Sequence, residues 1–187
     1  AGAAALLLEF DGEPIQVRAD AEEAERLLAG CGARAARDGA EAERFWKIRR
    51  SASQAMYLLA DSKVNQDIVL PLSSVKKYFE FFKKLSRETG LPSPVFGHSG
   101  DGNYHIHFMY DSAVSGARER AWNAMEAAVK KAVEMGGAVS GEHGIGFLKS
   151  KYMPFQHGAD ELETMRALKK MFDPKNILNP GKICFPG

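Results

Sequence analysis

Cysteine is scarce in this 187-residue sequence, which holds only Cys31 and Cys184. Two isolated thiols are too few for a disulfide framework or a thiolate zinc site, so the composition indicates a reducing compartment such as the cytoplasm. Long apolar runs are also missing, and none approaches the roughly 18 residues that a membrane-spanning helix needs. The sequence therefore predicts no transmembrane segment, although attachment to the surface of a membrane stays open.

An excess of charge of one sign is missing as well, since the formal net charge is +1. Lysine and arginine are spread along the chain instead of forming a basic patch, which argues against a nucleic-acid partner. Neither a strand followed by a GxGxxG turn and a helix nor a phosphate-binding P-loop occurs. The sequence therefore predicts neither a nucleic-acid-binding protein nor a domain that holds a dinucleotide by itself.

The sequence begins Ala-Gly-Ala-Ala-Ala-Leu-Leu-Leu, without an initiator methionine and without a basic region ahead of the leucines. A secretory signal peptide would carry such a basic region. We therefore expect a piece of a longer protein that is entered at a strand over residues 4–10.

Segments with strand and helix patterns alternate along the chain. Apolar runs and polar/apolar alternation predict strands over residues 4–10, 33–37 and 63–70 and a hairpin over residues 94–108. Helical spacing of apolar residues predicts helices over residues 19–30, 40–60, 75–85, 114–135 and 159–172. The side chains that the last helix is expected to turn inward are Leu162, Met165, Leu168 and Met171.

This order of elements predicts an α+β fold with a mixed or antiparallel sheet and helices packed on one face, in a ferredoxin-like arrangement. Because no internal repeat or low-complexity linker divides the chain, we predict one domain over residues 1–187.

The hairpin GHSGDGNYHIHF, residues 97–108, is the most informative segment. Residues 99–102, Ser-Gly-Asp-Gly, supply a turn, which places His98 opposite Asn103. Directly opposed residues share one face of a sheet, and the strand period of two adds His105 and His107 to it. Three of the five histidines thus crowd one face, while the other face is expected to enter a core with Tyr104, Ile106 and Phe108.

A glycine-rich segment over residues 136–146 carries Glu142 and His143 between glycines that let the backbone bend sharply. Two hairpin histidines and Glu142 would form the two-nitrogen, one-carboxylate set typical of catalytic zinc, manganese or iron sites. Asp101 and Asn103 could orient such ligands. Each of these histidines alone is more often a hydrogen-bonded structural side chain, so the hypothesis of a site depends on the grouping.

Three segments occur in the order GHSGDGNYHIHF, GGAVSGEHGIGFLK and LKKMFDPKNILNPGKI. Together they resemble the C-terminal domain of FAD-linked oxidases of the vanillyl-alcohol-oxidase type. Within that family they are similar to the branch of D-lactate dehydrogenase, glycolate oxidase GlcD-like proteins and D-2-hydroxyglutarate dehydrogenase. The resemblance covers nearly the whole chain. It implies a flavin-dependent oxidation of a D-2-hydroxy acid to the 2-oxo acid.

The resemblance also implies roles for individual residues. His98, His105 and Glu142 match positions that bind a divalent metal, zinc or manganese, in metal-dependent members. His143 matches the base that takes the substrate hydroxyl proton while the α-hydrogen leaves as hydride to the flavin. The other matched positions are Arg49 and Ser53 for substrate, His107 on the substrate side with its role left open, and Asn179 near the flavin.

Asn65 departs from the pattern of dicarboxylate-specific relatives, which have a lysine there, and this favours a monocarboxylic substrate such as lactate or glycolate. The implied partners are this small acid, an FAD-binding N-terminal domain of the same polypeptide that lies outside the sequence, an electron-acceptor protein and, in a homodimer, a second copy. The fragment alone is then expected to be inactive. The alternative is a stand-alone metal- or ligand-binding α+β module without redox activity.

Overall fold

The computed structural model describes residues 4–32, 34–36 and 38–183 of the chain. The chain divides into two compact units, residues 1–53 and residues 54–187. This division into compact units does not test the predicted single domain over residues 1–187, which stays a prediction.

The first unit is helical. Helix α1 (Pro14–Leu28) starts five residues earlier than predicted, because Pro14 occupies its first turn, where a missing N–H costs nothing. A short 3₁₀ turn (Ala29–Cys31) follows it, and helix α2 (Gly39–Ala55) comes next, with its last two residues in the second unit.

Two strands predicted in the first unit differ from the structure. The prediction for residues 4–10 is wrong, because these residues form no strand and Leu6, Leu7 and Leu8 are exposed. A strand needs a neighbour that shares its backbone hydrogen bonds, and no described segment pairs with this one. Of the strand predicted over residues 33–37, residues 33 and 37 lie outside the described part of the chain and residues 34–36 form no strand.

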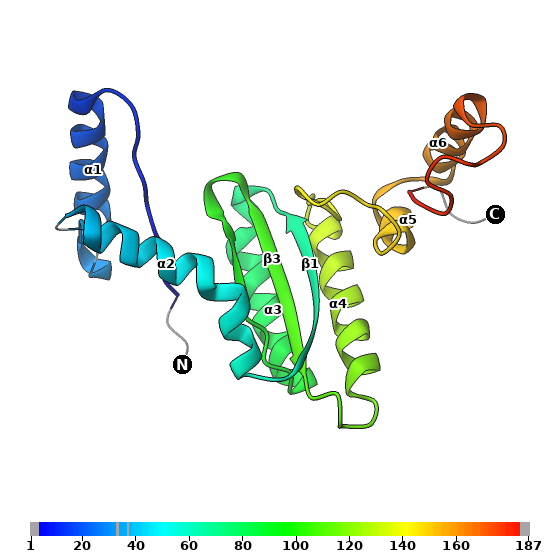
Figure 1. The fold of residues 1–187 in the computed structure, drawn as a ribbon, viewed down its shortest axis with the longest axis horizontal. Helices are drawn as coiled ribbons and strands as arrows, with labels where there is room; N and C mark the ends of the chain where they lie inside the picture. The colour runs from blue at the N-terminus through cyan, green and yellow to red at the C-terminus, as the bar shows by residue number, and fades with distance from the viewer. Residues whose placement is uncertain (1–3, 33, 37, 184–187) are drawn as a thin grey trace. The chain divides into compact units, whose positions relative to one another are not determined.

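The second unit carries the sheet, whose strands are β1 (Ser62–Val69), β2 (Val95–His98) and β3 (Asn103–Tyr110). Their order is β1-β3-β2 and both pairs are antiparallel, so the α+β prediction with an antiparallel sheet is confirmed. The long helices that cover one face of this sheet are α3 (Val75–Thr89) and α4 (Ala117–Glu134), as Figure 1 shows. Helices α5 (Met153–Gln156) and α6 (Ala159–Phe172) follow the glycine-rich segment.

The hydrophobic core lies between the sheet and helices α3 and α4. The predicted inward residues Tyr104, Ile106 and Phe108 of β3 are buried there against Tyr78 and Met125 of the two helices. Helix α6 keeps its predicted bounds but not its whole predicted face: Leu162 and Met165 pack on the core, whereas Leu168 and Met171 are 50% and 65% exposed. Among the described residues, no helix has both the length and the apolarity that crossing a membrane requires.

Candidate functional site

The polar face of the sheet, opposite the helices, carries the predicted histidines. His98 pairs with Asn103 across the hairpin, which confirms the predicted register. On the other side of β3, Asp67 pairs with His105 and Asn65 pairs with His107. Because directly opposed residues share a face, Asp67 of β1 is the immediate neighbour of His105.

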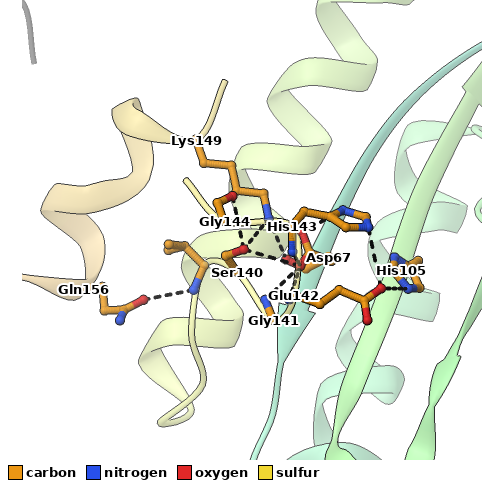
Figure 2. Close-up of polar contacts among 10 residues, drawn as sticks. Asp67, His105, Ser140, Gly141, Glu142, His143, Gly144, Lys149 and Gln156 are labelled. Carbon is orange, nitrogen blue, oxygen red and sulfur yellow. Dashed lines mark hydrogen bonds and ion pairs between the residues drawn. The ribbon is translucent and has the colours of Figure 1, made fainter. Parts of the chain in front are cut away.

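Asp67 is the centre of this face, and its side chain is fully buried. Its Oδ2 atom accepts hydrogen bonds from three consecutive backbone N–H groups, those of Gly141 (2.8 Å), Glu142 (2.8 Å) and His143 (3.0 Å). Its Oδ1 atom contacts the ammonium group of Lys149, which also donates to the Asp67 backbone carbonyl at 3.2 Å (Figure 2). One carboxylate therefore folds the glycine-rich segment onto the sheet.

These contacts shift the pKa values of the two buried partners, Asp67 and Lys149. Burial raises the pKa of the Asp67 carboxyl, but hydrogen bonds from Lys149 and from the backbone of His143 and Glu142 outweigh burial and hold this pKa well below its usual range. Burial lowers the pKa of Lys149, and Asp67 partly offsets that effect. Asp67 is therefore an ionised carboxylate near neutral pH, in contact with the amino group of Lys149.

Gly141 allows the chain to approach the sheet closely. A Cβ atom on Gly141 would lie 2.5 Å from Oδ1 of the buried Asn103 side chain, closer than real Cβ contacts occur. Residue 138 adds a bridge to the end of β1, since Ala138 and Val69 exchange backbone hydrogen bonds of 3.0 and 3.2 Å. A larger residue at position 141 would therefore require the buried Asn103 side chain or the segment that carries Glu142 and His143 to move.

His105, Glu142 and His143 form a compact group of possible ligands. Nε2 of His105 lies 3.0 Å from Oε1 of Glu142, and Nε2 of His143 lies 3.5 Å from the same oxygen. Nδ1 of His143 lies 3.2 Å from Oδ1 of Asp67, so the ring bridges the two carboxylates (Figure 2). One ligand atom from each of the three residues lies within 4.8 Å of the others. The His105 ring is buried, whereas Glu142 and His143 are about half exposed, at 47% and 51%, so small molecules can reach the group from outside.

His107 has a different environment from the other two histidines. It is buried beneath Phe96, whose ring centre lies 5.2 Å from its own, and its Nδ1 lies 3.2 Å from the carbonyl oxygen of Pro94. Burial, helped by the charge of Lys63, lowers the pKa of His107 to about 4. Its imidazole is therefore neutral at pH 7.

The remaining predicted residues lie around this group or in the other unit. His98 is exposed at the end of β2 and is not among the three described residues whose ligand atoms cluster. Arg49 and Ser53 lie on α2, in the first unit. Asn179 is exposed in a turn after α6, with a φ of 47°. The end of that turn returns to the glycine-rich segment, because Ile183 N–H donates to the Gly146 carbonyl at 2.9 Å.

Sequence reasoning did not single out Asp67 and Lys149. The available signal was a charged residue in each of two apolar settings: Asp67 precedes the apolar end of β1, and Lys149 follows Phe147 and Leu148. A buried aspartate is almost always paired. Neither pattern names the partner, because the two residues are 82 positions apart.

The sequence of the chain is similar to those of several known proteins. Over 183 residues the chain is 33% identical to glycolate oxidase subunit GlcD of Bacillus subtilis (strain 168), in an alignment that spans 96% of this chain and 39% of that protein. It is 36% identical to glycolate oxidase subunit GlcD of Escherichia coli (strain K12), over 96% of this chain and 36% of that protein. It is 32% identical to a mitochondrial D-lactate dehydrogenase [cytochrome] of Arabidopsis thaliana, over 97% and 33%. The chain thus spans 33–39% of the length of these relatives.

A solved structure has the same fold. The 4-ethylphenol oxidase of Gulosibacter chungangensis, in its isoeugenol complex, superposes with a TM-score of 0.59 at 20% identity, over 92% of this chain and 38% of that one. The family model of the FAD linked oxidases, C-terminal domain, matches residues 1–183. The chain, with its antiparallel sheet and histidine-bearing hairpin, therefore belongs to the FAD linked oxidases and corresponds to their C-terminal domain.

Proposed function

We propose that this chain forms the substrate side of a flavin-dependent dehydrogenase that oxidises a D-2-hydroxy acid, of the lactate or glycolate type, to the 2-oxo acid. The single observation that carries the proposal is the position of His143, whose ring contacts buried Asp67 through Nδ1 while the rest of the ring is half exposed beside Glu142. The names of the relatives, glycolate oxidase and D-lactate dehydrogenase, support this class of substrate.

His143 is the proposed general base. A neutral imidazole can accept a proton from a hydroxyl group, which is the task of a general base. In the proposed reaction Nε2 of His143 accepts the hydroxyl proton of the substrate while the α-hydrogen departs with both electrons of its C–H bond. The loss of H⁺ and H⁻ leaves the 2-oxo acid, so the proton and electrons balance.

FAD, when bound, supplies the hydride acceptor. We propose that it is held mainly by another domain of the same polypeptide, since the chain spans 36–39% of the bacterial relatives. Asn179 is the proposed contact of this chain with the flavin. An electron-acceptor protein would then reoxidise the flavin, and a homodimer is a further proposal.

The spacing of two donor atoms at the sheet supports the proposal of a divalent cation there. Two atoms that each lie about 2.1 Å from one ion at a tetrahedral angle are about 3.4 Å apart, close to the 3.0 Å between His105 Nε2 and Glu142 Oε1. We propose His105, Glu142 and His98 as the ligands of zinc or manganese. The bound cation would supply Lewis acidity that lowers the pKa of the substrate hydroxyl.

We propose that three residues, together with the lack of a positive charge at position 65, determine the substrate specificity. Arg49 and Ser53 are proposed to bind the substrate carboxylate, because a guanidinium group matches a carboxylate with two parallel hydrogen bonds. His107 is proposed as a neutral lining residue. Asn65, exposed opposite His107, offers no positive charge for a second carboxylate, so a monocarboxylic acid should be preferred to 2-hydroxyglutarate by about ten- to a hundredfold.

The test is a screen of D-2-hydroxy acids with the full-length FAD-loaded protein and an artificial acceptor dye. The expected result is reduction of the dye with D-lactate or glycolate and a lower kcat/KM for 2-hydroxyglutarate. A full-length protein that holds FAD yet reduces the dye with no hydroxy acid would contradict the proposed activity and favour a binding module. A higher kcat/KM for 2-hydroxyglutarate would contradict only the assignment of Asn65.

A further inference from the structure

The two carboxylate oxygens of Asp67 have different partners. Oδ2 accepts hydrogen bonds from the three backbone N–H groups of residues 141–143, which fix the path of the segment, and a longer one of 3.3 Å from Ser140 Oγ. Oδ1 faces the side chains, namely the ammonium group of Lys149 and Nδ1 of His143 at 3.2 Å. One buried group thus fixes both the backbone that carries His143 and the ring of His143 itself.

We propose that Asp67 is a positioning residue that sets the tautomer of His143. The proposal rests on the proposed function, in which His143 is the base, and adds which nitrogen acts. A neutral imidazole has one N–H and one lone pair, and an ionised carboxylate can only accept a hydrogen bond. Both ring nitrogens of His143 face a carboxylate, but Nδ1 lies 3.2 Å from Oδ1 of the fully buried Asp67, whereas Nε2 lies 3.5 Å from Oε1 of the half-exposed Glu142. The shorter approach to the buried carboxylate assigns the hydrogen to Nδ1 and the lone pair to Nε2.

The surroundings of Asp67 maintain this arrangement. The carboxylate is fully buried, so water does not compete for Oδ1. Lys149, whose side chain is 6% exposed, supplies the opposite charge, and its ammonium group is held in place by Ser140 Oγ at 2.9 Å. Nε2 of His143 lies on the side of Glu142, 3.5 Å from Oε1, which is where the proposed substrate hydroxyl is activated. The geometry thus separates a fixed N–H from a reactive lone pair.

A purely structural role for Asp67 makes a different prediction. If Asp67 only folds the segment, any side chain that accepts the three backbone N–H groups should preserve the reaction. The substitution Asp67→Asn would keep one such oxygen but would present an NH₂ group to Nδ1 of His143, which reverses the tautomer and moves the N–H to Nε2. Combining Asp67→Asn with Lys149→Met avoids placing the new NH₂ against the ammonium group. Lys149→Met alone keeps the carboxylate and serves as the matched variant.

The first measurement needs no variant at position 67. Nitrogen-15 NMR of the full-length FAD-loaded protein, labelled at histidine and assigned with His143→Gln, reports which ring nitrogen carries hydrogen. It is made under conditions in which the nitrogen-15 shifts themselves show the ring to be neutral. The expected result is N–H at Nδ1 of His143. An N–H at Nε2 would overturn the proposal, whatever the behaviour of the variants.

The second measurement is the rate of flavin reduction by D-lactate without oxygen. Asp67→Asn/Lys149→Met should reduce the flavin on the order of 10²–10⁴-fold more slowly than the unmodified protein, as expected for a reversed tautomer. Lys149→Met should be at least about tenfold faster than the double variant, because it keeps the carboxylate. Asp61→Asn, which alters an exposed carboxylate that accepts hydrogen bonds from Ser112, should leave the rate unchanged.

Two outcomes separate this inference from the proposed function. A folded double variant that retains the unmodified rate, while His143→Gln has lost it, would overturn the role of Asp67 and leave the base intact. If His143→Gln itself reduces flavin at the unmodified rate, the proposed base is wrong, while the NMR result still decides whether Asp67 sets the tautomer. A double variant that does not fold leaves the decision to the NMR measurement on the unmodified protein.

Discussion

Two buried aspartates organise two loops of the second unit by the same device. Asp67 accepts three consecutive backbone N–H groups and contacts Lys149. Asp173, at the end of α6, accepts the N–H groups of Ile177 (3.0 Å) and Leu178 (2.9 Å) and contacts Lys169. In each case a carboxylate gathers successive backbone donors and a lysine balances its charge.

The two loops differ in the side chains that contact the carboxylate. At Asp67 the ring of His143 lies against Oδ1, and Glu142 and His105 lie beyond it. The interactions described for Asp173 are with Lys169 and two backbone groups. The carboxylate and lysine by themselves therefore give a folded loop. The proposed reaction requires, in addition, a titratable ring that touches the carboxylate on one side and is open on the other.

The largest expected effect is on the reaction. His143→Ala should slow flavin reduction in the full-length protein by about 10²–10⁴-fold, the usual contribution of a general base. Because the proposed ligands are other residues, the variant should keep its metal. Rapid-mixing spectroscopy of the flavin and metal analysis of the same sample check both points. If His143→Ala also loses the metal, His143 is a ligand and the comparison of the two loops changes accordingly.

Metal binding is the next effect in size. His105→Ala and Glu142→Ala should each weaken zinc or manganese binding by at least about 100-fold, because each removes one of a few direct ligands. His98→Ala should do the same if His98 is the third ligand. Titration calorimetry on the metal-stripped full-length protein measures the affinities, with His157→Ala as the control histidine. Retention of normal affinity by His98→Ala would exclude His98 from the site.

The free energy of unfolding of two alanine variants compares the contributions of Asp67 and Asp173 to stability. Asp67→Ala leaves Lys149 buried without its partner and three backbone N–H groups without an acceptor, so we expect a loss of about 3–5 kcal/mol in the free energy of unfolding. Asp173→Ala removes a lysine contact and two backbone hydrogen bonds, and should cost less. Urea unfolding of both variants measures this order. An equal or larger cost for Asp173→Ala would show that the Lys149 pair contributes little.

The smallest expected effect is a change in the free energy of unfolding with pH. The pKa of Asp67 is lower in the folded chain than in the unfolded one, where it is about 3.9. Its contribution to stability is therefore fully present above about pH 4 and is lost as the pH falls through the lowered folded value. The stability difference between the unmodified protein and Asp67→Asn/Lys149→Met should shrink below pH 4. A difference that stays constant from pH 7 to pH 3 in urea unfolding would contradict the lowered pKa.

The sequence by itself determined the local parts of the site. Strand alternation and the turn at residues 99–102 were sufficient to place His98 opposite Asn103, because hairpin register depends on neighbouring residues and on turn chemistry. The helical period was sufficient for the bounds of α6 (Ala159–Phe172), although not for the burial of its face. Glycines around Glu142 and His143 marked a sharp bend for the same local reason.

Only the tertiary structure decided which distant residues meet. The pairing of β1 with β3 places Asp67 beside His105, and the fold of residues 138–149 brings Lys149 and His143 to the same carboxylate. It also left residues 4–10 without a strand partner among the described segments. The physical reason is that a backbone pattern specifies which residues share a face of one element, whereas a buried charge specifies only that it needs a partner. Which partner it finds depends on how elements far apart in the sequence pack together.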